Sequence, residues 1–431
     1  MSTTKHKTTS TERLMAAYFR YWLRMLAYAA QGSRAYYVWM GSLAVVIVIG
    51  LYNWVQQLKH GFVVTNLSDQ VSWGAYIANF TFLVGVAAAA VLLVVPAYAF
   101  HRDDVKKVVL LGELLAVSAI VMCLGFVVVD IGHPERALHL LRLNLPRSML
   151  AWDVVVLNGY LLLNLHIPGY LLWKTYRGER PNKSRYLPLV FVSMFWAVSI
   201  HTVTAFLYSG LGARPFWNSA VLAPRFLISA FAGGPPILLL ALYLVRQHLK
   251  FDISGSVFRM LLNIVRVMLP IHFFLFGAEM FTELYTDAHH AVAVHYLYFG
   301  HEGANMLVPY SWASLLLNVF ALVLFFQKDI LHKPVWVGIA CVSLVVGIWM
   351  EKGMGLLIPG FFPTPLGDLV EYIPSVTEFW VCMGIWALGI FLYSGMAKVA
   401  VAILQGDLRD PSSSSAASAK GEEEKDGGED A

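Results

Sequence analysis

Ten long runs of apolar residues, separated by polar connections, make up most of the chain. Each run is close to the roughly 20 residues that a helix needs to cross the hydrocarbon core of a membrane. The pattern therefore predicts an all-α integral membrane protein with ten membrane-spanning helices, which we number as spans 1 to 10. Their expected bounds are 35–58, 73–100, 107–130, 152–174, 187–211, 222–245, 259–284, 308–327, 334–350 and 378–403.

The basic residues alternate between the two sides of this arrangement. Of the 31 Lys and Arg residues, 23 lie in, or at most six residues from, the N-terminal segment, the connections after spans 2, 4, 6 and 8, and the C-terminal segment. Seven lie in or close to the alternate connections, and one, Arg266, lies deeper inside span 7. Because basic residues stay on the cytoplasmic side of a membrane, we expect both termini in the cytoplasm. Much of the outer surface is then formed by residues 130–147, 213–225, 285–307 and 351–377.

The composition agrees with a membrane protein and argues against other classes. Residues classed as hydrophobic make up 58% of the chain and charged residues 13%, against about 25% charged residues in a soluble domain. The net charge of +4 follows from the alternating basic connections. The expected partner is therefore the lipid bilayer, and no nucleic acid is expected.

Both ends of the chain differ from the apolar region between them. Residues 1–34 are polar and basic and lack a small-residue cleavage site, so we expect a cytoplasmic segment followed by a retained signal anchor in span 1. Residues 404–431 end in a stretch of Ser, Ala, Gly, Glu and Asp without aromatic residues, which predicts a disordered cytoplasmic tail. The ten-span membrane domain accordingly extends over 35–403.

The cysteines limit the redox chemistry of the chain. Cys123, Cys341 and Cys382 each lie alone within a span, and the sequence has no CxxC pair or Cys-His cluster. We therefore expect no iron–sulfur cluster and no metal site in this chain. If the protein takes part in electron transfer, another subunit or a small diffusible carrier must hold the electrons.

Polar residues gather at the outer ends of spans 2 to 5. An ionisable group in a membrane span is costly and usually faces a cavity or a partner. A carboxylate and an imidazole opposed across a pocket can hydrogen-bond the two oxygens of a quinone ring and handle its two protons. The residues expected at this depth are Asn79, Asp130, His133, His139, Asp153 and His201.

The connection after span 3 has unusual chemistry for an outer surface. Pro134 suits the first position of a helix, where its missing N–H is not needed. The polar residues that follow recur at three and four positions between leucines, which predicts a short amphipathic helix in the membrane interface. The three arginines of this connection either hold an acidic partner or polarise a ligand, and the alternative is simple pairing of Arg136 with Asp130 or Glu135. They are Arg136, Arg142 and Arg147.

Span 7 carries a second set of polar residues. His272, Glu279 and Glu283 are seven and four positions apart, which places them on one stripe of a helix from the outer surface to about mid-membrane. The deep groups on the inner half are Glu113, His166, Arg266 and Lys398. The groups expected to form a proton pathway are Glu113, Arg266, His272, Glu279 and Glu283.

Several short motifs resemble the polysulfide reductase membrane-subunit (NrfD-type) family. Trp73-Gly-Ala-Tyr76-Ile and Phe82-Leu-Val-Gly85 resemble the second span of that family, and residues 130–139 and 148–153 resemble its loop after span 3. The resemblance covers about residues 35–403. It implies two parallel four-helix bundles, formed by spans 2–5 and 6–9, with one flanking helix at each end.

The resemblance also implies a function. It implies a subunit of an oxidoreductase complex in a prokaryotic cell membrane that binds a quinone, expected to be menaquinone, and that carries neither haem nor an iron–sulfur cluster of its own. A ferredoxin-like iron–sulfur subunit would dock on the outer face, beside further membrane and cytochrome subunits of a complex in sulfur metabolism. We expect Asp130, His139 and Asp153 at the quinone head group. Further contacts are expected from Tyr76, Asn79, His133, Arg136 and His201.

Three other functions compete with this interpretation. A haem b cytochrome needs two histidines at one depth on neighbouring helices, and the candidates His166, His201 and His272 match poorly in depth. A transporter often has broken helices, for which Gly233-Gly-Pro-Pro236 in span 6 is a candidate. A purely structural anchor would tolerate the loss of the acidic side chains of Asp130, Asp153 and Glu279.

Overall fold

The protein is nearly all helix in its computed structural model, which describes residues 10–145, 147–286, 291–362, 364 and 370–411. No strand occurs among these residues, apart from an isolated bridge between His301 and Ala304. Ten of the described helices are long and apolar enough to cross a membrane. The prediction of an all-α protein with ten membrane-spanning helices is therefore confirmed.

The helices follow the expected spans closely. Spans 1 to 5 correspond to α2 (Arg34–His60), α3 (Ala75–Ala88) continued by α4 (Val91–Val94) and the π-helical turn η2 (Val95–Ala99), α5 (Asp103–Asp130), α7 (Met149–Tyr176) and α8 (Lys183–Ser209). Spans 6 to 10 correspond to α9 (Leu222–His248), α10 (Gly255–Thr286), α12 (Leu307–Phe325), α13 (Pro334–Lys352) and α15 (Val376–Gln405). The remaining helices are α1 (Ser10–Ala30), η1 (Gly61–Val64), η3 (Pro134–Arg136), α6 (Ala137–Asn144), η4 (Pro215–Trp217), α11 (Ala291–Tyr298), η5 (Ile330–His332), α14 (Met354–Leu357) and η6 (Pro359–Phe361).

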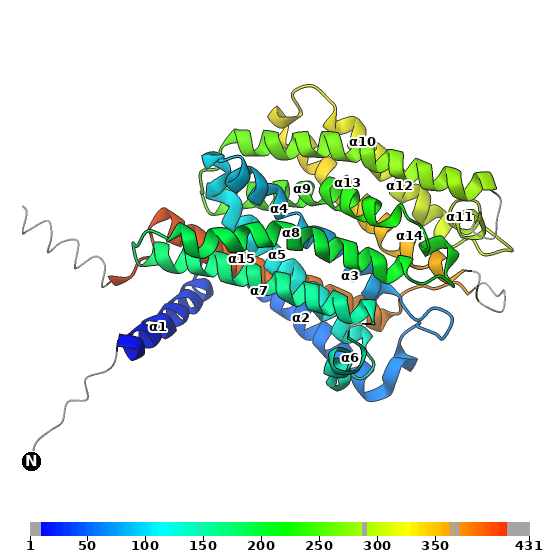
Figure 1. Cartoon of the computed structure of the whole chain (residues 1–431), viewed down its shortest axis with the longest axis horizontal. Coiled ribbons are helices and arrows are strands. Elements are labelled where there is room, and N and C mark those ends of the chain that lie inside the picture. Colours follow the sequence, from blue (N-terminus) through cyan, green and yellow to red (C-terminus); the bar gives the residue numbers. More distant parts are fainter. Residues whose placement is uncertain (1–9, 146, 287–290, 363, 365–369, 412–431) are drawn as a thin grey trace, which may run out of the picture.

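The long helices run side by side along the long axis of the molecule (Figure 1). An even number of spans returns the chain to the side on which it started. Figure 1 accordingly shows both ends of the described chain at one end of the molecule, while α6 and α11 lie at the opposite end. We call these the terminal end and the far end. Which end faces the cytoplasm stays a prediction.

Helices that follow one another in sequence pack together. In the first half, α3 contacts α5, α5 contacts α7, and α7 contacts α8; in the second half, α9 contacts α10 and α13, and α12 contacts α13. The halves meet where α3 and α8 contact α9, and α15 packs against α2 and α5. The division into two parallel bundles over spans 2–5 and 6–9 stays a prediction.

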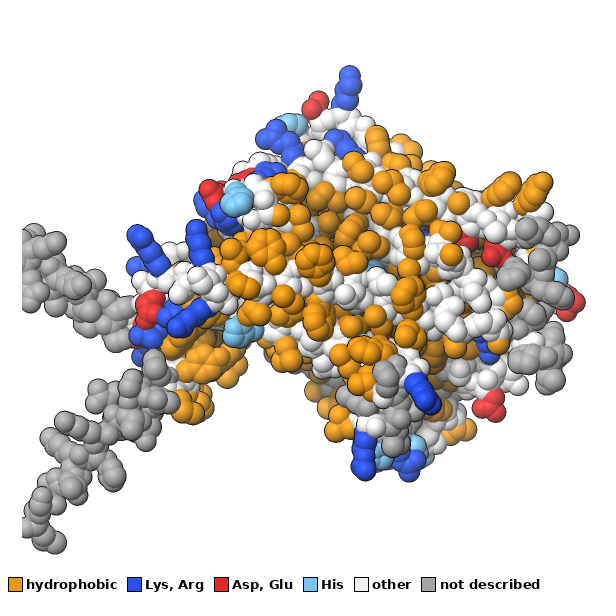
Figure 2. Space-filling model, viewed as in Figure 1, with side chains coloured by type: hydrophobic (Ala, Val, Ile, Leu, Met, Phe, Trp, Pro, Cys, Tyr) orange, Lys and Arg blue, Asp and Glu red, His pale blue; other side chains and the backbone are white. Residues whose placement is uncertain are grey.

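Small residues bring the two halves close to one another. All residues of α3 are buried, so this helix lies inside the protein instead of facing lipid. At its crossing with α9, a Cβ atom added to Gly234 would lie 2.1 Å from the Cβ of Ala89. Small side chains allow helices to approach closely in membranes. On the face shown in Figure 2, apolar side chains form a broad band across the middle of the molecule; most Lys and Arg side chains gather toward the terminal end, with a smaller group at the lower right.

The N-terminal segment contains a helix that the sequence analysis did not predict. In α1, Tyr21 packs edge-on against Trp173 and Tyr176, and Arg24 donates a hydrogen bond of 2.8 Å to the Tyr176 hydroxyl. Burial and the neighbouring tyrosines raise the pKa of Tyr21. The expected cytoplasmic segment 1–34 is therefore helical over Ser10–Ala30. Residues 1–9 and most of the expected tail, 412–431, lie outside the described residues.

Candidate functional site

The first candidate site lies between α7 and α8, where a carboxylate and an imidazole are buried together. Asp153 is 1% exposed, and its Oδ1 atom accepts a hydrogen bond of 2.6 Å from the Thr204 hydroxyl. His201 lies one turn before Thr204 on α8 and is 0% exposed. Neither ring nitrogen of His201 has a hydrogen-bond partner among the described residues. Because buried polar groups are normally hydrogen-bonded, His201 has capacity for a ligand, a water or a mobile side chain.

Asp130 ends α5, close to the hydrogen bonds of Tyr76. The Tyr76 hydroxyl donates to Gln57 Oε1 (2.6 Å), and Gln57 Nε2 donates to the carbonyl of Val129 (2.7 Å). These bonds attach the start of α3 to the end of α5. The Oδ1 atom of Asp130 is buried and has no hydrogen-bond partner within the described ranges. A second unsatisfied polar group therefore lies at the far end of the first half.

Asn79 uses its hydrogen-bonding capacity within the protein. Its Oδ1 atom accepts bonds from the indole N–H groups of Trp349 (2.9 Å) and Trp386 (2.8 Å). Its Nδ2 atom donates to the carbonyl of Ala75 (2.8 Å) and to Cys382 Sγ (3.6 Å). An amide side chain accepts two bonds and donates two, so the structure shows Asn79 joining α3 to α13 and α15.

The expected amphipathic helix after span 3 is present as η3 followed by α6. His133 Nδ1 lies 2.9 Å from Glu135 Oε1, and Arg136 Nε lies 3.9 Å from the same oxygen. A hydrogen bond from its own backbone N–H and the His133 ring hold the pKa of Glu135 below its ordinary value. His139 is exposed on α6, and no contact joins it to Asp153 in the described part of the chain. The structure therefore places His133, Arg136 and His139 on the surface.

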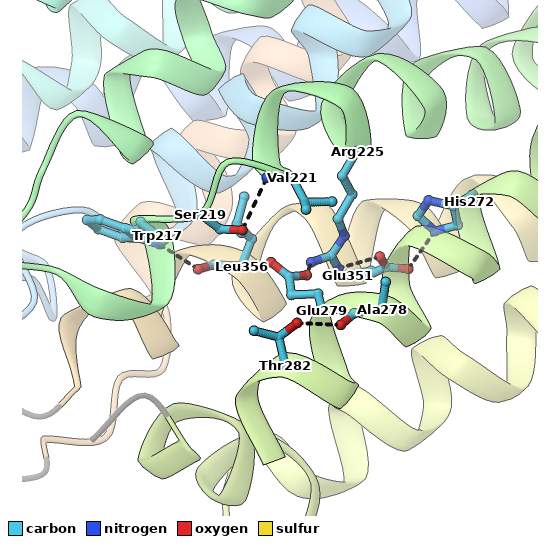
Figure 3. A network of polar contacts seen from close by, with 10 residues as sticks. All are labelled: Trp217, Ser219, Val221, Arg225, His272, Ala278, Glu279, Thr282, Glu351 and Leu356. Atoms are coloured by element: carbon cyan, nitrogen blue, oxygen red, sulfur yellow. Dashed lines mark hydrogen bonds and ion pairs between the residues drawn. The ribbon is translucent and has the colours of Figure 1, made fainter. Parts of the chain in front are cut away.

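A second candidate site, which we call the ion cluster, joins four helices of the second half. Arg225 of α9 forms ion pairs with Glu279 of α10 and with Glu351 of α13, the latter at 2.8 Å. Glu351 Oε2 also lies 3.0 Å from His272 Nε2 and accepts a bond of 3.1 Å from Asn318 Nδ2. Figure 3 shows the Arg225 guanidinium beside both carboxylates, with His272 on the other side of Glu351.

The ion cluster is buried and holds one guanidinium and two carboxylates. Arg225, Glu279 and His272 are all buried, as is Asn318. Removing one partner of such a group leaves an uncompensated charge, which costs about 3–5 kcal/mol. With His272 neutral, the formal charge of these groups is negative, so the cluster has capacity for one further proton or for a neighbouring cation.

A small pocket, partly open to solvent, adjoins the ion cluster. The hydroxyl of Tyr310 and the Oγ of Ser311 are buried there without a hydrogen-bond partner among the described side chains. Burial raises the pKa of Tyr298, which also lines the pocket. None of the residues expected at the quinone lines this pocket. Its polar lining consists of Arg225, Tyr298, Tyr310, Ser311, Ser314 and Glu351.

The structure separates the residues expected in the proton pathway. His272 and Glu279 meet in the ion cluster, and Glu283 is buried one turn beyond Glu279. Arg266 instead donates to the carbonyls of Phe325 (2.7 Å) and Gln327 (3.3 Å) at the end of α12. Glu113 is buried on α5, and its Oε2 has no hydrogen-bond partner among the residues described.

Several residues of these sites were missed in the sequence. Arg225 and Glu351 stand at the ends of apolar runs and were assigned to the outer surface. Glu378 was also missed: it accepts hydrogen bonds from Tyr372 and from the backbone N–H groups of Asn66 (3.0 Å) and Ser375 (2.8 Å). Burial and Glu378 raise the pKa of Tyr372. A buried carboxylate such as that of Glu279 needs a positively charged partner, and this requirement could have pointed to Arg225.

The fold and these buried polar groups define a ten-span membrane protein with ionisable side chains inside its helix bundle. The chain belongs to the polysulphide reductase NrfD family, whose sequence profile matches residues 63–363. The family predicted from the short motifs is therefore confirmed.

Three relatives match nearly their whole length. The chain is 26% identical over 405 residues to a putative dimethyl sulfoxide reductase membrane subunit of Halobacterium salinarum, covering 86% of this chain and 90% of the relative. It is 24% identical over 405 residues to a selenate reductase subunit of Mesobacillus selenatarsenatis, with coverage of 84% and 92%. It is 23% identical over 379 residues to the Hdr-like menaquinol oxidoreductase integral membrane subunit of Archaeoglobus fulgidus, with coverage of 83% and 91%.

Proposed function

We propose that the protein is the quinone-interacting membrane subunit of a prokaryotic respiratory complex. It exchanges electrons between menaquinone or menaquinol and an iron–sulfur subunit at the outer face. The observation that carries this proposal is the buried group of Asp153, Thr204 and His201, in a chain that is similar over 83% of its length to a menaquinol oxidoreductase membrane subunit.

The side chains of this group fit the needs of a quinone head. A quinone has two ring oxygens, and its conversion to quinol takes up two electrons and two protons. Within the described ranges neither ring nitrogen of His201 has a partner, so the ring can donate to one quinone oxygen. Thr204 holds one carboxylate oxygen of Asp153, which leaves the other oxygen of this side chain to accept or donate a proton. We propose that Asp130, at the far end of α5, passes protons between this group and outer water.

The far end of the molecule supports the proposal of an iron–sulfur partner. Arg136 and Arg142 are exposed on η3 and α6, and Arg147 follows in the same connection. Exposed arginines at this end suit an acidic surface on a docking protein. We propose a ferredoxin-like iron–sulfur subunit as that protein, within a complex that includes other membrane and cytochrome subunits.

The ion cluster supports a second role for the chain, the movement of protons. Its Arg225 and Glu351 line the adjoining pocket, and Glu283 lies one turn beyond Glu279 on α10, toward the far end. We propose that Glu279, Glu351 and His272 exchange protons with water in this pocket. Arg225 would hold the two carboxylates in place.

The cellular setting follows from the same proposal. We propose that the complex serves sulfite or sulfate metabolism, as does that of the related DsrP subunit, in the inner membrane of a prokaryote with both termini in the cytoplasm. The three relatives carry names for dimethyl sulfoxide, selenate and menaquinol chemistry. The substrate that finally gives or takes the electrons is therefore identified by assaying the assembled complex with each candidate compound.

A quinone titration of the purified protein tests the main proposal. A fluorescent menaquinone-site inhibitor is titrated into the wild type, Asp153→Asn and the control Asp252→Asn, which removes an exposed carboxylate at the terminal end. Loss of a hydrogen bond to a charged group costs about 1.5–3 kcal/mol, so Asp153→Asn raises Kd about tenfold or more, and the control does not. Absence of saturable binding in the folded wild type overturns the proposal, and an absorbance spectrum of the same sample tests for haem.

A further inference from the structure

Two adjacent residues at the end of α13 face different parts of the protein. Successive residues of a helix point about 100° apart. Glu351 faces the second half, where it contacts Arg225 and His272. Lys352 faces α9 and α3, at the boundary between the two halves. Because Glu351 and Lys352 are adjacent in the chain, the end of α13 lies both at the ion cluster and at the boundary between the two halves.

Lys352 is a buried amine with few partners. It is 6% exposed, and its Nζ atom donates one hydrogen bond, of 3.2 Å, to the carbonyl of Phe226. The same atom lies 4.3 Å from the centre of the Phe226 ring. No carboxylate oxygen lies within 4.0 Å of Lys352 in the described part of the structure. An ammonium has three N–H donors, so most of its donor capacity is available to a further acceptor.

His201 lies on the other side of this boundary. Seven residues after His201, on the same face of α8, the Tyr208 hydroxyl shares a hydrogen bond with the Thr81 hydroxyl of α3, one turn before Gly85. The two ring nitrogens of His201 have no partner among the described residues. Helices α3 and α9 each contact both α8, which carries His201, and α13, which carries Lys352. Two buried polar groups with spare hydrogen-bonding capacity therefore face one region.

Glycines keep this region open for the lysine side chain. A Cβ atom added to Gly85 of α3 would lie 3.5 Å from Lys352 Nζ, so any larger side chain there would take up the space around the amine. Gly353 follows Lys352, and a Cβ there would lie 2.6 Å from the carbonyl oxygen of Trp349 and 3.4 Å from that of Ala78. The close approach of α13 to α3 therefore requires glycine at position 353. This contact also holds the backbone of Lys352 in place.

We propose that Lys352 is a proton-carrying link between the Asp153–Thr204–His201 group and the ion cluster. The four-carbon stem of lysine is flexible, which lets the amine turn between the two sides. One proton passes from the His201 imidazolium to the Lys352 amine, and the resulting ammonium gives one proton to the Glu351 carboxylate. No electron moves in these steps, and each donor is left neutral. This link rests on the proposed function, because its role would be to pass protons released or taken up at the quinone to or from the ion cluster.

A double-mutant cycle tests the link without any quinone. The infrared carbonyl band of Asp153, identified by its loss in Asp153→Asn, is followed against pH in the wild type, Glu279→Gln, Lys352→Met and the double variant. Sites that share a proton titrate together. Glu279→Gln therefore shifts the Asp153 titration in the wild type, and the shift falls about twofold or more when Lys352 is replaced. An equal shift in both backgrounds, or no shift in either, overturns the link.

A turnover assay of the complete complex separates proton transfer from fixed charge. Lys352→Met removes the charge, and Lys352→Arg keeps the charge but does not release its proton at ordinary pH. Both variants slow quinone-linked turnover about tenfold or more while Kd for the quinone-site inhibitor stays within about twofold. The matched control is Lys398→Met, since Lys398 also lies over aromatic rings and donates to a backbone carbonyl, of Tyr28 at 3.0 Å. Full turnover in Lys352→Arg shows that a fixed charge suffices and overturns the link.

The two proposals fail in different ways. Absence of quinone binding in the wild type, together with a Lys352-dependent infrared shift, overturns the proposed function and leaves the link. Saturable quinone binding with an infrared shift that does not depend on Lys352 overturns the link alone. Lys352→Arg keeps the charge and the stem, so it tests the link even where Lys352→Met does not fold.

Discussion

At the scale of single residues, the buried charges of the second half depend on Arg225. This guanidinium is shared by carboxylates from two other helices, and its planar shape provides several N–H donors at once. It also lies over the Phe276 ring, with 5.5 Å between the guanidinium carbon and the ring centre. The residue thus neutralises charge and holds α9, α10 and α13 together.

Arg225→Met should destabilise the protein strongly, because it leaves Glu279 and Glu351 buried without their cation. The expected loss is about 3–5 kcal/mol, measured by thermal or denaturant unfolding in detergent. Arg259→Met, at an exposed position of α10, should change stability little. Adding Glu279→Gln should recover part of the loss, and an Arg225→Met variant as stable as the wild type would contradict the charge pairing.

Thr204→Val should preserve the fold and impair the first site. The substitution keeps the shape of the side chain but removes the hydroxyl that donates to Asp153. We expect a loss of about 1.5–3 kcal/mol in quinone-inhibitor binding, as for other hydrogen bonds to charged groups. The control on the same helix is Thr202→Val, whose hydroxyl donates only to the carbonyl of Val198 at 3.0 Å among the described contacts. Equal effects of the two substitutions would show that Thr204 has no particular role.

At the scale of helices, the contact between α3 and α9 decides how the two halves meet. Helix α3 is buried along its whole length, which requires small side chains at its crossings. The alanines 87–90 supply them at the end of α3 and directly after it, and Gly233 and Gly234 supply them on α9. The boundary that Lys352 occupies is formed by the same two helices.

Gly234→Ala should disturb this contact, because the added Cβ would overlap the methyl group of Ala89. Overpacking of this kind typically costs about 1–3 kcal/mol, which a thermal unfolding curve in detergent would show. Gly169→Ala on α7 is the control: nothing lies within 4 Å of a Cβ there, and alanine favours helix. Unchanged unfolding of Gly234→Ala would mean that the helices are farther apart than described.

At the scale of the whole molecule, the two ends of the helix bundle differ in charge. Most Lys and Arg side chains on the face shown in Figure 2 gather toward the terminal end, as the alternation in the sequence predicts. The proposed docking surface and the pocket beside the ion cluster both lie toward the far end, near α6 and α11 (Figure 1). A single orientation in the membrane therefore fixes which compartment exchanges protons and meets the iron–sulfur partner.

Cysteine labelling of intact cells should establish this orientation. The native cysteines are buried, so a membrane-impermeant maleimide reports on an introduced cysteine. Asp69→Cys, exposed in the connection after span 1, should be labelled from outside, and Asp252→Cys only after the membrane is opened. Labelling in the reverse order would place both termini outside and would move the proposed docking surface to the cytoplasm.

The sequence determined the number and nature of the spans, because an apolar run of sufficient length can be satisfied in lipid only as a helix. It also identified the family, from motifs such as Trp73-Gly-Ala-Tyr76. Periodicity placed His272 and Glu279 on one face of span 7, and the structure shows both in one cluster. These are properties of a local stretch of chain.

Only the tertiary structure decided which polar groups meet. Arg225 stands at the start of one apolar run, and Glu351 and Lys352 stand together at the end of another, so their partners depend on how the helices are arranged in space. The same holds for Arg266, which donates to carbonyls at the end of α12 and not to the acids of its own helix. Spacing within one helix fixes a face, but the group that lies opposite that face is set by packing between helices far apart in the sequence.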